Sequence, residues 1–158
     1  MAAAIGIVAA SWLMPTRLFL INQTPSAPDG VYWRVSGQAR PGAYLAFRAE
    51  GIGFEALSRI GFELPTMPLL KPIAVGPDEQ VCYVGDRFQL SDGGTIPLGD
   101  PHWHGIELPV WRDCRVLRAD EYFVYSDRTP NSLDSRHFGP VTDAMVIGSY
   151  ALIWAWRQ

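Results

Sequence analysis

The chain has 158 residues, a length that indicates a single domain with a substantial core. Its formal net charge is −3, only 18% of its residues are charged, and no basic run is present. That charge pattern argues against nucleic acid as a partner. With 13 prolines and 15 glycines, the sequence is divided into short pieces.

The first 21 residues are the most hydrophobic part of the chain. Residues 2–14 are apolar apart from Ser11, and residues 18–21 are apolar again after Arg17. A membrane helix needs about 20 residues, a length that the segment 2–21 reaches when residues 15–17 between the two runs are included. An arginine near one end can extend to the interface. We therefore expect a membrane anchor over residues 1–21. A signal peptide is one alternative, although it lacks a charged start. An anchor that begins upstream of Met1 is another.

Residues 22–158 are expected to form a mainly β domain. Short runs rich in Val, Ile, Tyr and Phe lie between Gly, Pro and Asp, a pattern typical of strands. The expected strands cover residues 31–35, 43–49, 69–75, 80–84, 87–90, 110–118, 121–125 and a buried terminal strand at 144–156. Asp92, Gly93 and Gly94 predict a hairpin turn. Residues 51–64 fit one helical turn or a loop, and 97–109 and 126–140 fit loops.

Lys71 is the only lysine in the chain. Pro72 restricts it to extended backbone, and its other near neighbours are apolar. An amine that is poorly hydrated has a lowered pKa. With a pKa of roughly 7–8 a lysine can act as a general base. The alternative is a surface lysine that extends its ammonium group into water.

Ser26 lies in a loop with Pro25 on one side and Ala27 and Pro28 on the other. Such a stiff loop, just beyond a membrane segment, could present a serine nucleophile. The alternative is an ordinary turn serine.

Cys82 and Cys114 are the only cysteines. If the domain is exported, a disulfide between them is the default expectation. A zinc site with His102 and His104 is a rival interpretation, but the spacing matches no usual zinc motif. Free thiols are the third alternative. We expect no metal and no cofactor.

Four blocks of the sequence together resemble the type I signal peptidases, and more narrowly the TraF-type branch of bacterial conjugation systems. The most specific is the run from Asn131 to Val141. The blocks are Asn22-x-Thr24-Pro25-Ser26-x-Pro28-x-Gly30-x-Tyr32, Leu69-Leu70-Lys71 with Pro77, Glu121-x-Phe123, and Asn131-Ser132-Leu133-Asp134-Ser135-Arg136-x-Phe138-Gly139-Pro140-Val141. The chain departs from the family pattern at Pro72, where a basic residue is usual, and at Pro77-Asp78-Glu79, where Pro-Gly-Asp is usual.

The resemblance implies a Ser-Lys dyad. Ser26 would be the nucleophile and Lys71 the base that takes its proton, with Ser132 orienting the amine. The Ser26 backbone N–H and the Thr24 hydroxyl would form the oxyanion hole.

The same resemblance assigns structural roles near the site. Asp134 and Arg136 would form an ion pair under the dyad, with Ser135 between them. The implied fold is the signal-peptidase type, built from antiparallel sheets. The sequence contains neither Gly-x-Ser-x-Gly nor Ser-x-x-Lys, the motifs of other serine hydrolases. Their absence leaves the Ser-Lys dyad as the best-supported acyl-transfer arrangement.

The implied function is a membrane-anchored serine endopeptidase. It would cleave leader peptides after small residues from exported or pilin-like proteins, with a conjugation or secretion system as its setting. The expected location is the bacterial inner membrane, with the catalytic domain on the periplasmic side. A transpeptidase with the same acyl-enzyme chemistry and a non-catalytic β domain that binds exported peptides are the alternatives.

Overall fold

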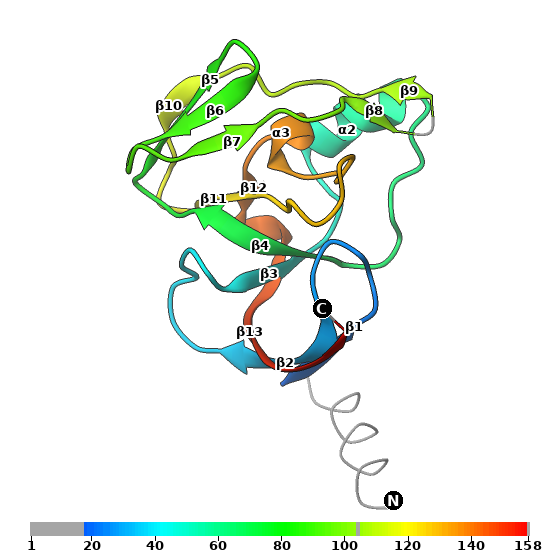
Figure 1. Cartoon of the computed structure of the whole chain (residues 1–158), viewed down its shortest axis with the longest axis vertical. Coiled ribbons are helices and arrows are strands. Elements are labelled where there is room, and N and C mark those ends of the chain that lie inside the picture. The colour runs from blue at the N-terminus through cyan, green and yellow to red at the C-terminus, as the bar shows by residue number, and fades with distance from the viewer. Residues whose placement is uncertain (1–17, 104, 158) are drawn as a thin grey trace, which may run out of the picture.

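The structure is a computed structural model that describes residues 18–103 and 105–157. A seven-stranded antiparallel sheet runs through it in the order β1-β2-β13-β3-β4-β11-β12. Figure 1 shows β4 and β11 in the middle of the molecule, with β1, β2 and β13 at one end. The strands are β1 Phe19–Asn22, β2 Asp29–Val35, β3 Tyr44–Phe47, β4 Leu69–Val75, β11 Glu121–Val124, β12 Val141–Thr142 and β13 Val146–Arg157.

A smaller sheet lies at the other end of the molecule (Figure 1). Its order is β10-β5-β6-β7, and a separate hairpin pairs β8 with β9. The strands are β5 Gln80–Val84, β6 Arg87–Leu90, β7 Thr95–Pro97, β8 His102–Trp103, β9 Ile106–Glu107 and β10 Cys114–Val116. Cys114 lies directly opposite Cys82 in the β10–β5 pair, and the two form a disulfide. They are therefore not available as zinc ligands, and His104 lies outside the described residues.

The described residues also form three short helical segments: α2 Ile52–Arg59, α3 Ser135–Phe138 and the 3-10 helix η1 Asp143–Met145. The region 51–64, expected to hold one turn or a loop, forms the eight-residue helix α2. Gly53 allows α2 to approach the backbone of α3, because a Cβ there would collide with Phe138. The buried rings of Phe54 and Phe138 stack with centroids 4.4 Å apart.

Two expected loops contain regular structure. The 97–109 region holds the β8–β9 hairpin, and 126–140 holds α3. None of the described helices has the length and apolar character needed to cross a membrane. Residues 1–17, most of the expected anchor, lie outside the described residues.

The two ends of the chain differ from expectation in detail. Phe19–Asn22 pairs with β2 as β1, so the folded sheet already includes residues 19–21. The terminal strand β13 is present, but its second half is not buried, since Ile153, Trp154 and Trp156 are exposed. Its buried part is the middle, where Tyr150 is fully enclosed.

Residues on the two faces of β4 belong to three buried apolar clusters. Lys71, Ile73 and Val75 alternate on one face and are all buried. Ile73 belongs to the cluster against α2 and α3, and Val75 to the cluster under the small sheet. Leu70, on the opposite face, packs with Tyr32 and Tyr150. Lys71 therefore continues a face that is otherwise core.

Candidate active site

The Lys71 side chain is 4% exposed. Its position in β4 is opposite Leu45 of β3, which is itself fully buried. The amine finds one hydrogen-bond partner, donating from Nζ to Ser132 Oγ at 2.7 Å. The structure therefore excludes the surface-lysine alternative and brings together two of the expected site residues.

Burial is the main cause of the altered protonation of Lys71. Loss of hydration lowers the pKa of the amine to about 8. The Asp134 carboxylate opposes this effect by stabilising the ammonium form, and the Arg136 guanidinium adds to it. A substantial neutral fraction near pH 8 is what a general base requires.

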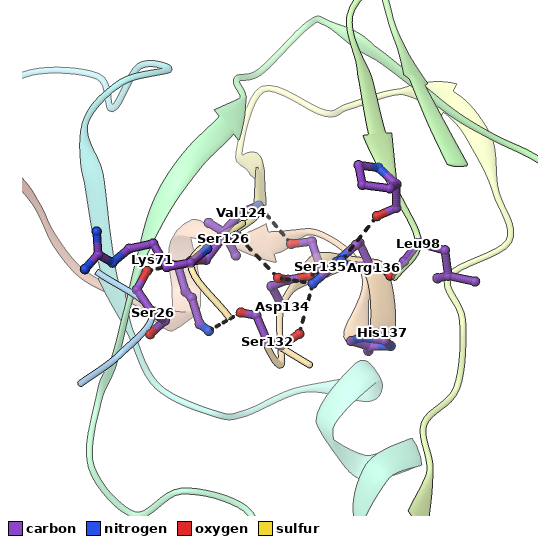
Figure 2. Close-up of polar contacts among 12 residues, drawn as sticks. Ser26, Lys71, Leu98, Val124, Ser126, Ser132, Asp134, Ser135, Arg136 and His137 are labelled. Carbon is purple, nitrogen blue, oxygen red and sulfur yellow. Dashed lines mark hydrogen bonds and ion pairs between the residues drawn. The ribbon is translucent and has the colours of Figure 1, made fainter. Parts of the chain in front are cut away.

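Ser26 lies in the loop between β1 and β2, next to β4. Its hydroxyl donates to Leu70 O at 3.4 Å, one residue before Lys71. In the view of Figure 2 the Lys71 amine points toward Ser132, with Ser26 on its other side. The Ser26 hydroxyl must therefore turn from the Leu70 carbonyl toward Lys71 Nζ before a proton can pass between them.

The side chain of Asn22 holds the loop that carries Ser26 through several hydrogen bonds. Its Nδ2 donates to the carbonyls of Thr24, Ala27 and Pro28 at 3.0, 2.9 and 3.2 Å. Its Oδ1 accepts from Thr24 N at 3.2 Å and from Thr24 Oγ1 at 2.7 Å. The oxyanion role of the Thr24 hydroxyl stays a prediction, and it requires the hydroxyl to leave Asn22.

Asp134 and Arg136 form the expected ion pair, and both are buried. Arg136 donates from Nε to Asp134 Oδ1 at 2.8 Å and from Nη2 to Oδ2 at 3.0 Å. The same carboxylate caps the start of α3 by accepting from Arg136 N. Ser135 Oγ, between them, accepts from Val124 N at 2.9 Å and so ties α3 to β11.

Arg136 also fastens the site to the small sheet. Its Nη1 donates to Pro97 O at 3.2 Å and Leu98 O at 2.8 Å, and its Nη2 to Ser132 O at 3.3 Å. Gly99 leaves room for it, because a Cβ there would lie 2.9 Å from Arg136 Nη1. The ion pair thereby fixes the segment that presents Ser132 to Lys71.

The departure from the family pattern at Pro77-Asp78-Glu79 is accommodated locally. Asp78 stands where glycine is usual and adopts a positive φ of 62°, the conformation that glycine favours. Asparagine and aspartate tolerate this region better than other side chains. Within the same turn, Glu79 Oε2 accepts from Gly76 N at 3.1 Å.

Two residues of the site were not singled out from the sequence. Ser126 Oγ donates to Ser26 O at 2.7 Å, and Arg128 Nε donates to Pro25 O at 3.3 Å. Ser126 N in turn donates to Asp134 Oδ2 at 3.3 Å. Figure 2 shows Ser126 between Ser26 and the Asp134 pair. The only sequence signal was their position shortly before Asn131.

His137 is a further buried group near the site. Its ring Nδ1 lies 3.1 Å from Pro109 O, and its Nε2 is buried without a partner among the described residues. Burial lowers the pKa of the ring, which favours the neutral form. Neither His137 nor any other described residue belongs to a group of His, Cys, Asp or Glu that could hold a metal ion.

Comparison with known proteins gives the family. The family model described as signal peptidase, peptidase S26, matches residues 1–156. The chain belongs to this signal peptidase family. Two plasmid transfer proteins TraF from Escherichia coli are each 26% identical to it. One match covers 98% of this chain and 91% of the relative, and the other covers 80% and 76%.

Among solved structures, a signal peptidase I from Enterococcus faecalis V583 overlaps with a TM-score of 0.40 and 19% identity. It covers 72% of this chain and 97% of its own. Membership of the signal peptidase family, with TraF proteins among the relatives, confirms the resemblance stated from the four sequence blocks. The mainly β fold of antiparallel sheets is likewise confirmed.

Proposed function

We propose that this signal peptidase relative is a membrane-anchored serine endopeptidase that uses Ser26 as nucleophile and Lys71 as general base. The observation that carries the proposal is the buried Lys71 amine. It lies on a core face of β4, its pKa is lowered to about 8, and Ser132 orients it. Burying the Lys71 amine costs free energy, and an apolar side chain at this position would stabilise the fold better.

The chemistry follows from the positions of these groups. Ser26 Oγ attacks the scissile carbonyl carbon while its proton passes to neutral Lys71. The carbonyl oxygen becomes an oxyanion, stabilised by the Ser26 N–H and the Thr24 hydroxyl. When the intermediate collapses, the C–N bond breaks and Lys71 returns its proton to the leaving amine. Water then attacks the ester carbonyl while Lys71 takes its proton. The bond from the acyl carbon to Ser26 Oγ breaks, and Lys71 returns the proton to Ser26 Oγ.

The substrates would be leader-bearing exported proteins. Two relatives are named as plasmid transfer proteins, which supports a conjugation system as the setting. Pilin-like subunits as substrates are what the family resemblance implies. Cleavage after small residues is the specificity that the family resemblance implies.

The location would be the inner membrane, with the domain on the periplasmic side. An apolar face on β1, β2 and β13 supports attachment to a bilayer. Phe19 is opposite Trp33, Ile21 is opposite Val31, and Trp154 is also opposite Val31, so these side chains share one face of the sheet. Ile21, Trp33 and Trp154 are exposed, and tryptophans favour the membrane interface. The chain that leads into β1 is the apolar N-terminal stretch.

The test is cleavage of a synthetic peptide that contains Ala-x-Ala by the full chain in detergent micelles. Wild-type protein should cleave it, and Ser26→Ala should abolish cleavage. Ser149→Ala is a matched control, since Ser149 is a buried serine on β13 whose hydroxyl has no partner among the described residues. Equal cleavage by Ser26→Ala and wild type would reject the proposal. No cleavage by wild type, with binding of the peptide retained, would favour the non-catalytic peptide-binding domain.

A further inference from the structure

The loop that carries Ser26, residues 23–28 between β1 and β2, is called the nucleophile loop here. Side chains on two sides of it bind its backbone carbonyl groups. Asn22 takes the carbonyls of Thr24, Ala27 and Pro28. Among the other carbonyls of the loop 23–28, those of Pro25 and Ser26 face the segment 126–128 that follows β11. Arg128 donates to the first at 3.3 Å and Ser126 to the second at 2.7 Å.

These two carbonyls belong to the two peptide planes on either side of the Ser26 Cα. The Pro25 carbonyl shares its plane with the Ser26 N–H. In the part of the chain that the structure describes, no acceptor takes that N–H. The Ser26 carbonyl lies in the next plane. Fixing both planes fixes the backbone dihedrals of Ser26, and with them the directions of its N–H and its side chain.

We propose that Arg128 and Ser126 are positioning residues that together set the Ser26 backbone, so that its N–H points at the oxyanion. This inference rests on the proposed function. Arg128 has a second effect on the same amide. A cationic donor on the Pro25 carbonyl polarises the peptide group and makes the Ser26 N–H a stronger donor.

The arrangement links both halves of the dyad to one ion pair. Asp134 accepts from Ser126 N, and its partner Arg136 donates to Ser132 O. Ser126 is 1% exposed, and its Oγ also accepts from Arg128 N at 3.3 Å. Its backbone is therefore held by Asp134 while its hydroxyl reaches across to the nucleophile loop.

The experiment measures kcat and KM of the full chain in detergent on an Ala-x-Ala peptide for Arg128→Met, Arg128→Lys, Ser126→Ala and Ser126→Thr. Removing a direct oxyanion donor costs about 10²–10³ in kcat. A group that acts through one peptide plane should cost less, about tenfold, with KM little changed. Ser126→Thr keeps the hydroxyl and should retain most of the rate. Arg112→Met is the matched control, because Arg112 is an exposed arginine that contacts the Tyr83 ring instead of the loop.

A second readout separates positioning of the oxyanion donor from a general loss of structure. A peptide aldehyde forms a hemiacetal with Ser26 whose oxygen occupies the oxyanion position, whereas the corresponding alcohol does not react. Arg128→Met should weaken the aldehyde about tenfold, in proportion to kcat, and leave the alcohol unchanged. The midpoint of the pH–rate profile should stay in place, because the charges that set the Lys71 pKa are Asp134 and Arg136.

The inference is overturned if Arg128→Met retains the wild-type kcat and aldehyde affinity, or if its pH–rate midpoint moves. Arg128 is exposed, so this variant should fold even if Ser126→Ala does not. Failure of the proposed function looks different, since wild-type protein itself would then be inactive toward the peptide.

Discussion

Burial makes the neutral form of the Lys71 amine more populated than it would be in water at the same pH. The cleavage rate should therefore depend on pH. Because the folded-state pKa is lowered to about 8, the base is available above this pH and protonated below it. We expect kcat/KM to fall as the pH drops through about 8, with the slope of a single ionisation. A pH–rate profile on the Ala-x-Ala peptide measures this. A profile that stays flat from pH 6 to 9 (roughly two units below and one above the expected midpoint) would contradict the role of Lys71.

The direction in which the Asp134 charge moves the Lys71 pKa can be tested with Asp134→Asn. The Asp134 carboxylate stabilises the Lys71 ammonium and so raises its pKa against the effect of burial. Removing the negative charge should move the pH–rate midpoint to lower pH. The fold should also lose about 3–5 kcal/mol of stability, because Arg136 is left as an uncompensated buried cation. A midpoint that moves to higher pH, in protein shown to be folded by its thermal transition, would refute this electrostatic account.

The main candidate site residues could be singled out from the sequence because each lies in a short linear pattern. Ser26 lies in the Thr24–Pro28 run, Lys71 in its apolar run, and Ser132 in the Asn-Ser-x-Asp-Ser-Arg run. Ser126 and Arg128 could not be predicted in this way. They contact Ser26 and Pro25 across 100 and 103 residues of chain, and nothing in their immediate neighbours indicates that contact.

At the level of elements, strands were predicted best where the pattern of apolar residues is local. Strands β4, β5 and β6 have the expected bounds. The helix α3 was missed because its residues are Ser135, Arg136, His137 and Phe138, all of them buried. Three of these four buried residues are polar and the segment is only four residues long, so no apolar periodicity of a helix appears in the sequence. It forms because Asp134 caps it and because Arg136 and Ser135 find partners on other elements.

The small sheet depends on the Cys82–Cys114 disulfide, which closes a loop with a sequence separation of 32. The chain-entropy model gives about 3–4 kcal/mol for a loop of this size. Replacing both cysteines with serine should lower the free energy of unfolding by that amount, as measured by denaturant titration.

The same variant should keep its peptidase rate under native conditions, because the bridge joins β5 to β10 and touches no residue of the dyad. Thiol titration of denatured, unreduced protein provides the check on pairing. Two free thiols in protein recovered from the periplasmic side would contradict the expected disulfide.

At the level of the whole molecule, the apolar face of β1, β2 and β13 lies at the same end as the nucleophile loop, which joins β1 to β2. A domain that lacks residues 1–17 but keeps β1 should therefore retain weak binding to phospholipid vesicles. Replacing Trp33 and Trp154 with serine should reduce this binding at least several-fold, because their side chains would leave the interface. Flotation of the domain with vesicles measures the effect.

The Val84→Ser variant is the control for this experiment, since Val84 is an exposed apolar residue of the small sheet at the opposite end of the molecule. If the tryptophan variants float with vesicles as well as the wild-type domain does, the face is not a membrane contact.

The general-base role of Lys71 is tested most directly by the cleavage rate of Lys71→Arg. Arginine keeps the positive charge and much of the side-chain length, but its guanidinium stays protonated at any working pH. It cannot accept the Ser26 proton, so the rate should fall to the level of Lys71→Ala, with the folded state verified by the thermal transition. Cleavage by folded Lys71→Arg at close to the wild-type rate would contradict the Ser26–Lys71 mechanism.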